Sequence, residues 1–273
     1  MQANSLWTPP TGTLGAIVAE AEVRAQAMEA MRDALERDSL RMPAGPSLRV
    51  ALRQDSVTLL AEVKRRSPSR GAIAAGLDAV EQARAYTDGG SAGVSILTEP
   101  AHFGGSNADL LDVRRSLTIP VLKKDFHVTT VQLLEARALG ASAALLIARA
   151  LAPRQLAEMM RYGHALGLEL LVEVRDQAEL ERALEGGATM IGVNNRDLET
   201  LIIDPATSDR LIPHIPPHVV AIAESGVKTR ADVERYAAVG ADAVLVGSSL
   251  SASSDPVAAT RALAGVTRRD RAG

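Results

Sequence analysis

Short apolar runs alternate with longer amphipathic segments along most of the chain. The runs are rich in Val, Ile and Leu, which is typical of parallel strands covered by helices on both faces. The segments between them place apolar residues at helical spacing. Eight such runs occur, at residues 58–64, 93–97, 120–124, 143–147, 168–174, 190–194, 219–223 and 243–246. This order of elements predicts eight consecutive βα modules.

Glycine-containing junctions connect the predicted helices to the apolar runs that follow them. Glycine can take the left-handed conformation that ends a helix without a steric penalty. Four junctions have this form, at residues 88–93, 139–141, 186–188 and 239–241. They precede every second run, so the repeating unit is a pair of βα modules. We therefore predict an α/β fold, a closed (β/α)8 TIM barrel. The alternative, an open doubly wound sheet, would need a less uniformly apolar edge strand.

The chain before the first run predicts an extension of the barrel. Residues 14–37 have the pattern of one long amphipathic helix, with an apolar stripe that includes Leu14, Met31 and Leu35. A short linker and a brief helical piece follow, whereas residues 1–13 predict an irregular arm. We expect one domain over residues 1–273, with extension helices at 14–56 and the barrel at 57–266.

Charged residues enter the first run at its carboxyl end, within AEVKRRSPSRG at residues 61–71. Side chains on a strand alternate between faces, so Glu62 and Lys64 share the inward face while Ala61 and Val63 pack against the helices. Charged side chains are seldom buried unless they are paired. Because α/β barrels bind ligands at the carboxyl ends of their strands, these two charges predict a functional site.

The same alternation brings polar side chains to the barrel mouth from four more runs. Lys124, Glu173 and Glu224 have inward parity, as do Asn194 and Arg196. A single strand-end charge is adequately explained by contact with solvent. Charges of alternating sign from several strands lower one another's desolvation cost in a confined mouth, where they stay reactive. The set as a whole therefore predicts an acid–base site.

Two loops after the last two runs predict an anion site. Ser225 and Gly226 follow the seventh run, and Gly247 and Ser248 follow the eighth. Glycines let backbone N–H groups approach an anion, and barrels often bind phosphate at these two positions. Either loop alone is equally well explained as an ordinary Gly/Ser turn. In a closed barrel Ser67 of the first loop would lie beside them.

Composition narrows the possible partners. The net charge is -3 and aromatic residues make up 2% of the chain, so we expect no nucleic-acid or membrane partner. The N-terminus lacks a secretory pattern and no apolar segment reaches the length of a membrane span, so we expect a cytoplasmic location. We expect a small phosphorylated substrate and a monomer or weak homo-oligomer.

The chain also lacks the residue patterns of several reaction types. Cysteine is absent, which excludes disulfides, thiol nucleophiles and zinc–thiolate sites. The histidines show no paired spacing for a metal site, and we expect them at surface or loop positions. They are His102, His127, His164, His214 and His218.

Eight short strings of residues run in order over nearly the whole chain. They are AEVKRRSPSRG (61–71), SILTEPAHFGGS (95–106), PVLKKDF (120–126), ALLI (144–147), LVEV (171–174), GVNNRDL (192–198), AESG (223–226) and LVGSSL (245–250). Together they resemble the indole-3-glycerol phosphate synthase family of tryptophan biosynthesis. The resemblance implies a (β/α)8 barrel, an N-terminal helix that caps its mouth, and no cofactor or metal. It also implies a carboxy-lyase that closes the pyrrole ring of 1-(2-carboxyphenylamino)-1-deoxyribulose 5-phosphate with loss of carbon dioxide and water.

The resemblance further implies roles for individual residues. Lys124 matches the general acid that protonates the ribulose carbonyl, and Glu173 matches its acid–base partner for dehydration. Glu62 would support proton transfer, Lys64 would bind the anionic substrate, and Asn194 would assist at the reacting centre. An ammonium group near the ketone oxygen suits this reaction, because negative charge develops there as the aromatic carbon attacks.

The remaining matched positions contact the substrate without a direct part in the chemistry. Polar contacts to the sugar and anthranilate ends are implied for Ser67, Arg196 and Glu224. Phosphate contacts are implied for Ser225, Gly226, Gly247 and Ser248. An apolar slot for the anthranilate ring is implied for Pro68, Phe103, Phe126, Leu145 and Leu198.

Two other functions remain open from the sequence. A different phosphosugar barrel, such as one like phosphoribosylanthranilate isomerase, would rely on Cys and Asp, and this chain has no Cys. A non-catalytic relative that binds a phosphorylated ligand would need the two glycine loops but not Lys124 and Glu173.

Overall fold

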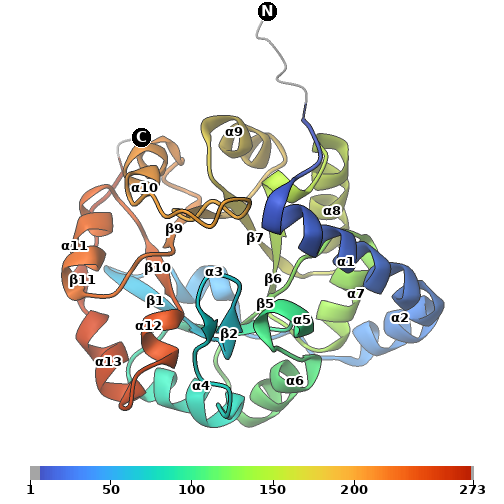
Figure 1. The fold of residues 1–273 in the computed structure, drawn as a ribbon, viewed down its shortest axis with the longest axis horizontal. Coiled ribbons are helices and arrows are strands. Elements are labelled where there is room, and N and C mark those ends of the chain that lie inside the picture. The colour runs from blue at the N-terminus through green and yellow to red at the C-terminus, as the bar shows by residue number, and fades with distance from the viewer. Residues whose placement is uncertain (1–6, 272–273) are drawn as a thin grey trace, which may run out of the picture.

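The computed structural model describes residues 7–271 and is built around a closed barrel of parallel strands (Figure 1). The barrel strands are β1 (Ser56–Val63), β4 (Gly93–Leu97), β5 (Val121–Lys124), β6 (Ala143–Ile147), β7 (Glu169–Val174), β8 (Met190–Asn194), β9 (Val220–Glu224) and β10 (Ala243–Val246). Each pairs with the next in chain order, and β10 pairs with β1. This closure confirms the predicted (β/α)8 fold and rules out the open sheet.

The predicted runs coincide with the barrel strands to within two residues at either end. β1 begins earlier than predicted because a short strand near the C-terminus, β11 (Val266–Thr267), pairs antiparallel with Ser56 and Val57. A second feature, the hairpin of β2 (Arg66–Ser67) and β3 (Gly71–Ala72), was not predicted. It lies in the loop after β1 and carries part of the site.

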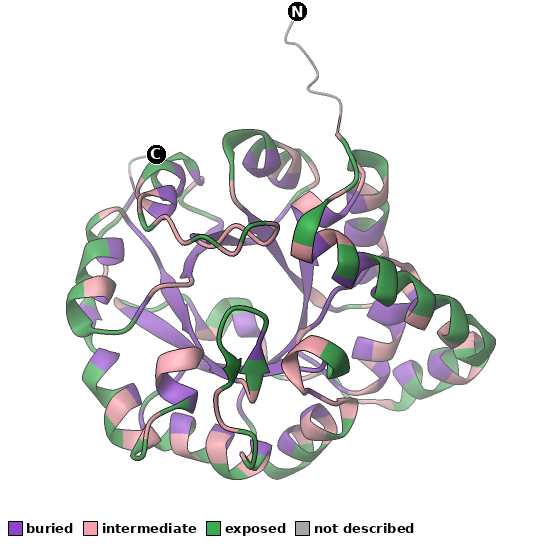
Figure 2. Ribbon diagram, viewed as in Figure 1, coloured by how far each residue is buried: buried purple, intermediate pink, exposed green. Residues whose placement is uncertain are grey.

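Helices form the outer layer, with their apolar faces against the barrel (Figure 2). The longer ones are α4 (Ala79–Asp88), α6 (Asn107–Ser116), α7 (Thr130–Ala138), α8 (Pro153–Ala165), α9 (Gln177–Glu185), α10 (Ala206–Leu211), α11 (Arg230–Ala238) and α13 (Pro256–Leu263). Single turns occur at α5 (Pro100–Phe103), α12 (Ser248–Ser251), η2 (Ala148–Ala150) and η3 (Ile212–His214).

The predicted glycine junctions have the expected left-handed backbone. Gly90, Gly140, Gly187 and Gly240 have φ values of 95°, 80°, 82° and 90°. Gly167, just before β7, has the same geometry with a φ of 67°. The junction is therefore not confined to alternate modules, and the βα unit itself is the repeat.

The N-terminal extension differs from the single helix predicted over residues 14–37. It consists of α1 (Gly12–Met28), one 3₁₀ turn η1 (Glu29–Met31) and α2 (Arg32–Arg41). A 3₁₀ turn has three residues per turn, so it rotates the following side chains away from the α-helical stripe. Met31 is consequently 55% exposed, and α2 packs against α7. The short helix α3 (Leu48–Ala51) then leads to β1 as predicted.

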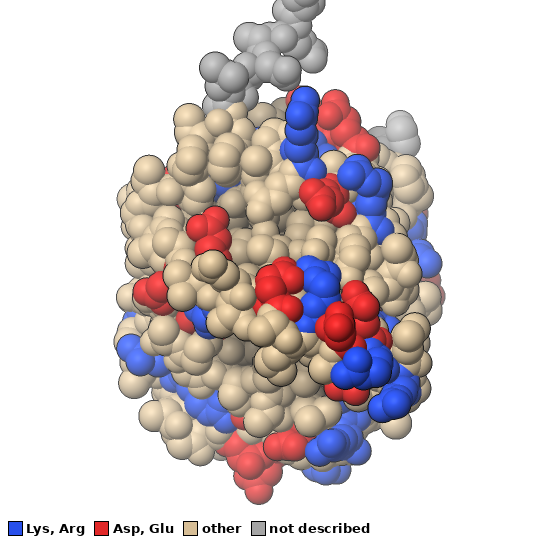
Figure 3. Space-filling view, turned by 90° about the vertical axis from the view of Figure 1, so that its right-hand side faces the viewer, with Lys and Arg blue, Asp and Glu red and all other residues tan. Residues whose placement is uncertain are grey.

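The first helix of the extension lies beside the barrel mouth. Of the irregular arm predicted at 1–13, residues 1–6 lie outside the described residues, and α1 already begins at Gly12. In Figure 1 α1 lies along one side of the mouth, where Leu14 and Ile17 line a cavity. On that side of the molecule acidic and basic side chains are interspersed (Figure 3). No helix within residues 7–271 is long and apolar enough to cross a membrane.

Candidate active site

A cavity of about 260 Å³ opens at the carboxyl ends of the barrel strands. Every residue that the sequence assigned to catalysis, substrate binding or phosphate binding lines it. The side chains come from the ends of the strands and from the loops that follow them, as the parity argument predicted. Their shared location is established, whereas their individual roles stay predictions.

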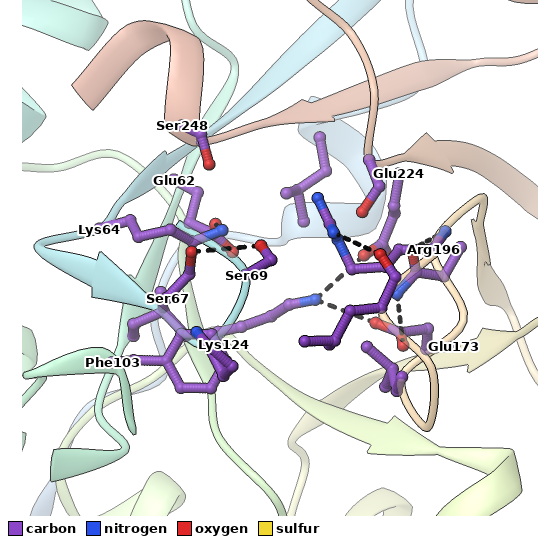
Figure 4. A pocket seen from close by; sticks show the side chains of 18 of the residues that line it. Glu62, Lys64, Ser67, Ser69, Phe103, Lys124, Glu173, Arg196, Glu224 and Ser248 are labelled. Atoms are coloured by element: carbon purple, nitrogen blue, oxygen red, sulfur yellow. Dashed lines mark hydrogen bonds and ion pairs between the residues drawn. The ribbon is translucent and has the colours of Figure 1, made fainter. Parts of the chain in front are cut away.

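Lys124, at the end of β5, reaches into the middle of the cavity (Figure 4). Its ammonium Nζ donates to Glu173 Oε2 at 3.1 Å and to Glu224 Oε2 at 3.0 Å. The two carboxylates come from β7 and β9, across the mouth. All three side chains are largely removed from water, so their interactions are stronger than those of surface ion pairs.

The carboxylates of Glu62, Glu173 and Glu224 all act on the charge of Lys124. Burial alone would lower the pKa of Lys124, but the negative charges of Glu224 and Glu173 outweigh it and raise that pKa above its ordinary value. Burial, reinforced by Glu173 and Glu62, raises the pKa of Glu224 to about 7 although Lys124 opposes the shift. Lys124 thus stays charged, and Glu224 holds a proton more readily than an ordinary exposed carboxyl group does.

Glu62 and Lys64 form a second ion pair on the opposite side of the cavity. Glu62 is 2% exposed and lies directly against Gly247, where a Cβ atom would collide with its carboxylate. Gly192 of β8 leaves the same space for the carboxylate of Glu224. These two glycines therefore allow buried acidic side chains to fit into the barrel mouth.

Asn194 fixes the orientation of Glu173. Its amide Nδ2 donates to Glu173 Oε1 at 2.8 Å, and its Oδ1 accepts from the backbone N–H of Arg196 at 2.9 Å. The guanidinium of Arg196 donates to the carbonyl of Leu201 at 2.8 Å. Burial, together with the nearby positive charge of Arg70, lowers the pKa of Arg196 from its ordinary value. Arg196 therefore presents a partly desolvated cation to the cavity.

An apolar slot lies next to Lys124. The rings of Phe103 and Phe126 are 6.1 Å apart and tilted by 35°. Other lining side chains of this kind are Pro68, Leu145 and Leu198, together with Leu14 and Ile17 of α1. The slot suits a flat aromatic group, because aromatic faces and aliphatic side chains favour such a ligand over water.

The two glycine loops lie together, as the pairing of β9 with β10 requires. Ser225 has a φ of 65° and Gly226 a φ of 90°, so two consecutive residues adopt the left-handed region. A non-glycine residue in this conformation is strained, and such strain is concentrated at functional sites. Gly247 and Ser248 begin the short turn α12 on the facing side. Backbone N–H groups and hydroxyls from both loops can contact an anion.

Sequence reasoning missed several lining residues. Ser69 and Arg70 lie in the β2–β3 hairpin loop, and Ser69 Oγ is 3.5 Å from Ser67 Oγ. Lys228 and Ser249 extend the two glycine loops. They adjoin predicted residues in the sequence, so extending each loop by a few polar positions would have found them.

The described residues contain one group with the composition of a metal site. Ligand atoms of Glu20, Glu99 and His102 lie within 4.8 Å of one another, outside the cavity. Glu99 already accepts three backbone N–H groups, at Ala101, His102 and Phe103. Its carboxylate also pairs with the guanidinium of Arg24 at 3.5 Å. The cluster is therefore better explained as a packing contact than as a metal site.

One histidine occupies a loop, as expected, but is buried there. His127 lies in the loop after β5 but is only 2% exposed, and its Nδ1 is 2.7 Å from the carbonyl of Leu145. Burial and the charge of Lys123 lower the pKa of His127 to about 4. This side chain is therefore neutral at physiological pH and packs behind the cavity.

Comparisons with known proteins agree on one family. The family model described as indole-3-glycerol phosphate synthase matches residues 15–263. Indole-3-glycerol phosphate synthase of Streptomyces griseus is 48% identical over 83% of this chain and 84% of its own length. Indole-3-glycerol phosphate synthase 1 of Streptomyces coelicolor is 49% identical over 85% of this chain and 86% of its own.

Solved structures support the fold alone. The chain resembles 3-hexulose-6-phosphate synthase from Salmonella typhimurium with a TM-score of 0.60 and 16% identity. The match covers 76% of this chain and 96% of that one.

Proposed function

The chain belongs to the indole-3-glycerol phosphate synthase family, and from this premise we propose how its cavity performs the reaction. The substrate is 1-(2-carboxyphenylamino)-1-deoxyribulose 5-phosphate, and the reaction class is that of a carboxy-lyase. The aromatic ring occupies the apolar slot that Phe103 and Phe126 line, and the phosphate contacts the two glycine loops. The ribulose carbonyl lies between them, next to Lys124.

One observation carries this proposal. Lys124 Nζ lies between two buried carboxylates, at 3.0 and 3.1 Å, in a cavity that also offers an aromatic slot and an anion-binding end. A binding protein for a phosphorylated ligand would need only the anion-binding end. The combination with a buried, charged amine supports chemistry at a carbonyl group.

In the first step a carbon–carbon bond forms between the ring carbon that bears the carboxylate and the ribulose carbonyl carbon. The electron pair of the carbonyl bond moves to oxygen, which takes a proton from the ammonium of Lys124. Glu173 and Glu224 hold that ammonium in place, and Asn194 holds Glu173. Lys124 is a weak acid in water, so its value lies in its position beside the developing charge.

Loss of carbon dioxide and water completes the ring. The bond to the carboxylate breaks, and its electron pair restores the aromatic ring. The new hydroxyl group leaves as water with a proton from a carboxylic acid, and a ring proton is released to a carboxylate. Glu173 and Glu62 take these roles, while Lys64 and Arg196 bind the anionic groups of the substrate. The apolar slot excludes water and strengthens these contacts.

We also propose that the chain acts in the cytoplasm, as a monomer or weak homo-oligomer. The interspersed surface charges and the net charge of -3 support a freely diffusing protein.

Turnover by purified protein tests the proposal, with the indole product followed by its absorbance. Lys124→Ala should lower kcat by roughly a thousandfold while substrate still binds, because general acid catalysis contributes this much. Ser248→Ala should mainly raise KM, by roughly tenfold, because it removes one hydrogen bond to a charged group.

Lys123→Met provides a matched control for Lys124. Lys123 precedes Lys124 on β5 but points out of the cavity, where its Nζ donates to Glu135 of α7 at 2.9 Å. Its loss should lower stability and leave kcat near that of the wild type. Absence of turnover in the wild type would contradict the proposed reaction, and an active Lys124→Ala variant would contradict the assigned role.

A further inference from the structure

The hydrogen-bond ladder between β1 and β10 ends before β1 does. Its pairs run from Thr58 opposite Ala243 to Ala61 opposite Val246, where β10 stops. The backbone N–H of Thr58 donates to Asp242, so every second residue of β1 turns its backbone groups toward β10. The carbonyl of Glu62 and the N–H of Lys64 therefore face a region that β10 no longer fills.

The hydroxyl of Ser251 occupies this region. Ser251 Oγ donates to the carbonyl of Glu62 at 3.1 Å and accepts from the backbone N–H of Lys64 at 3.2 Å. In a parallel sheet one residue of the partner strand donates to residue i and accepts from residue i+2 of its neighbour. One side-chain hydroxyl thus supplies the donor and the acceptor that a longer β10 would have provided opposite Val63.

Tyr86 of α4 joins the same hydrogen-bond network from the helix layer. Its hydroxyl lies 3.1 Å from Ser251 Oγ and donates to the Glu62 carbonyl at 3.2 Å. Tyr86 is fully buried and Ser251 is 5% exposed, so water does not compete for these groups. Burial raises the pKa of Tyr86 to about 12, which keeps its hydroxyl protonated as a donor.

We propose that Ser251 is a positioning residue that holds the carboxylate of Glu62 and the ammonium of Lys64 in their reactive places. The inference rests on the proposed roles of these two residues. Ser251 does not line the cavity, and its hydroxyl acts on the reaction through the β1 backbone. Ser251 binds the backbone carbonyl of Glu62 and the backbone N–H of Lys64. A shift of this backbone therefore moves both side chains of the ion pair. Misplacement of about 1 Å is enough to cost roughly a hundredfold in rate.

The same residue links this strand end to the anion-binding turn. Ser251 is the last residue of α12, and its backbone N–H donates to the carbonyl of Gly247 at 2.9 Å. Gly247 and Ser248 begin that turn and line the cavity. Ser251 therefore sets the distance between the phosphate end of the site and the Glu62–Lys64 pair.

Ser251→Ala tests the proposal through the balance of kcat and KM. We expect kcat to fall roughly tenfold and KM to rise by no more than about threefold, because Glu62 leaves its position for proton transfer whereas Lys64 is only one of several groups that bind the substrate. The measurement is made at a temperature where circular dichroism shows both proteins folded. Ser253→Ala is the matched control, since the hydrogen bonds of Ser253 Oγ within residues 7–271 are both with the backbone of Asp255 and not with β1. It should keep the wild-type kcat.

A double variant separates positioning from a general loss of structure. If Ser251 acts through Glu62, adding Ser251→Ala to Glu62→Gln should lower kcat far less than it does in the wild type. Equal effects in both backgrounds, or a wild-type kcat in folded Ser251→Ala, would overturn the inference. Turnover by wild type that is lost in Lys124→Ala would meanwhile leave the proposed function intact.

If Ser251→Ala does not fold, the Tyr86→Phe variant tests the inference instead. It keeps Ser251 and removes only the supporting hydroxyl. We expect kcat to fall about threefold, with little change in KM, because one of the bonds to the Glu62 carbonyl is lost. An unchanged kcat in this variant would equally overturn the inference.

Discussion

Glu224 is a buried carboxyl group with one oxygen unpaired among the described residues. Its Oε2 accepts from Lys124, whereas its Oε1 has no hydrogen-bond partner within residues 7–271. Burial raises its pKa to about 7, above the ordinary value of 4.5. The folded protein therefore binds more protons than the unfolded chain between these two values. Ionisation of Glu224 in this range removes stability as the pH rises.

We predict that Glu224→Gln reduces this pH dependence. Below about pH 4.5 the wild-type group is protonated in both states, and its favourable contribution is fully present. That contribution is lost as the pH rises through about 7 in the folded protein. Glutamine cannot ionise, so the stability of the variant relative to wild type should increase from pH 4.5 to pH 8. Urea unfolding at several pH values measures the difference.

Glu179→Gln is the control, because it changes a second buried carboxyl away from Lys124. Burial raises the pKa of Glu179 to about 7, and its carboxylate accepts from the backbone N–H of Arg175 at 2.7 Å. The control should show a similar change in pH dependence with less effect on kcat. A pH-independent difference between Glu224→Gln and wild type would show that Glu224 does not titrate in this range.

Strand parity explains why so many residues of the cavity were predicted. Glu62, Lys124 and Glu173 lie at strand ends, where a two-residue period fixes the direction of each side chain. Ser251 could not be found in this way. Its role depends on where β10 stops relative to β1, and a sequence pattern does not give the register between two strands.

At the scale of elements, α1 is held on the barrel mouth by a charge contact. Arg24 lies 3.5 Å from Glu99 Oε1 and 3.4 Å from Asp125 Oδ1, in the loops after β4 and β5. Both carboxylates are buried and have further donors. Thr98 Oγ1 donates to Asp125 at 2.5 Å. The contact joins α1 to the two loops that carry Phe103 and Phe126.

We predict that Arg24→Met raises KM about fivefold and lowers kcat less. The variant keeps the aliphatic length but removes a contact worth about 1 kcal/mol at these long distances. Leu14 and Ile17 would then line the slot less firmly. Steady-state kinetics measures both constants. Arg32→Met is the control, because Arg32 pairs with exposed Glu29 at 2.8 Å and should change neither. Equal KM values for both variants would refute the role of Arg24.

The elements that the sequence misjudged have a common cause. The eight barrel strands form a regular repeat, and each is determined by its own apolar run. The 3₁₀ turn at Glu29–Met31 and the β2–β3 hairpin depend instead on what they pack against. The local sequence pattern therefore predicts the barrel strands well. It predicts the 3₁₀ turn and the hairpin poorly, because tertiary contacts override a weak local preference.

At the scale of the whole molecule, the C-terminal segment packs against the amino ends of β1, β9 and β10. The carboxylate of Asp242, fully buried before β10, pairs with Arg268 Nη1 and Arg271 Nη1, each at 2.9 Å. Arg271 also donates to the carbonyls of Ile215 at 3.0 Å and Val219 at 2.6 Å. These groups lie at the end of the barrel opposite the cavity, so stability and catalysis are served by different ends, as is general for this fold.

Arg271→Met should therefore lower stability without changing the chemistry. Removing one partner of a buried pair costs roughly 3 kcal/mol, because carbonyls and a carboxylate lose their donor. For a domain of this size that loss lowers Tm by roughly 6 to 12 °C. Thermal unfolding measures the shift, and kcat at 25 °C should match the wild type. Arg269→Met, at an exposed position two residues away, should change neither value. A fall in kcat of folded Arg271→Met at 25 °C would mean that the two ends of the barrel are coupled.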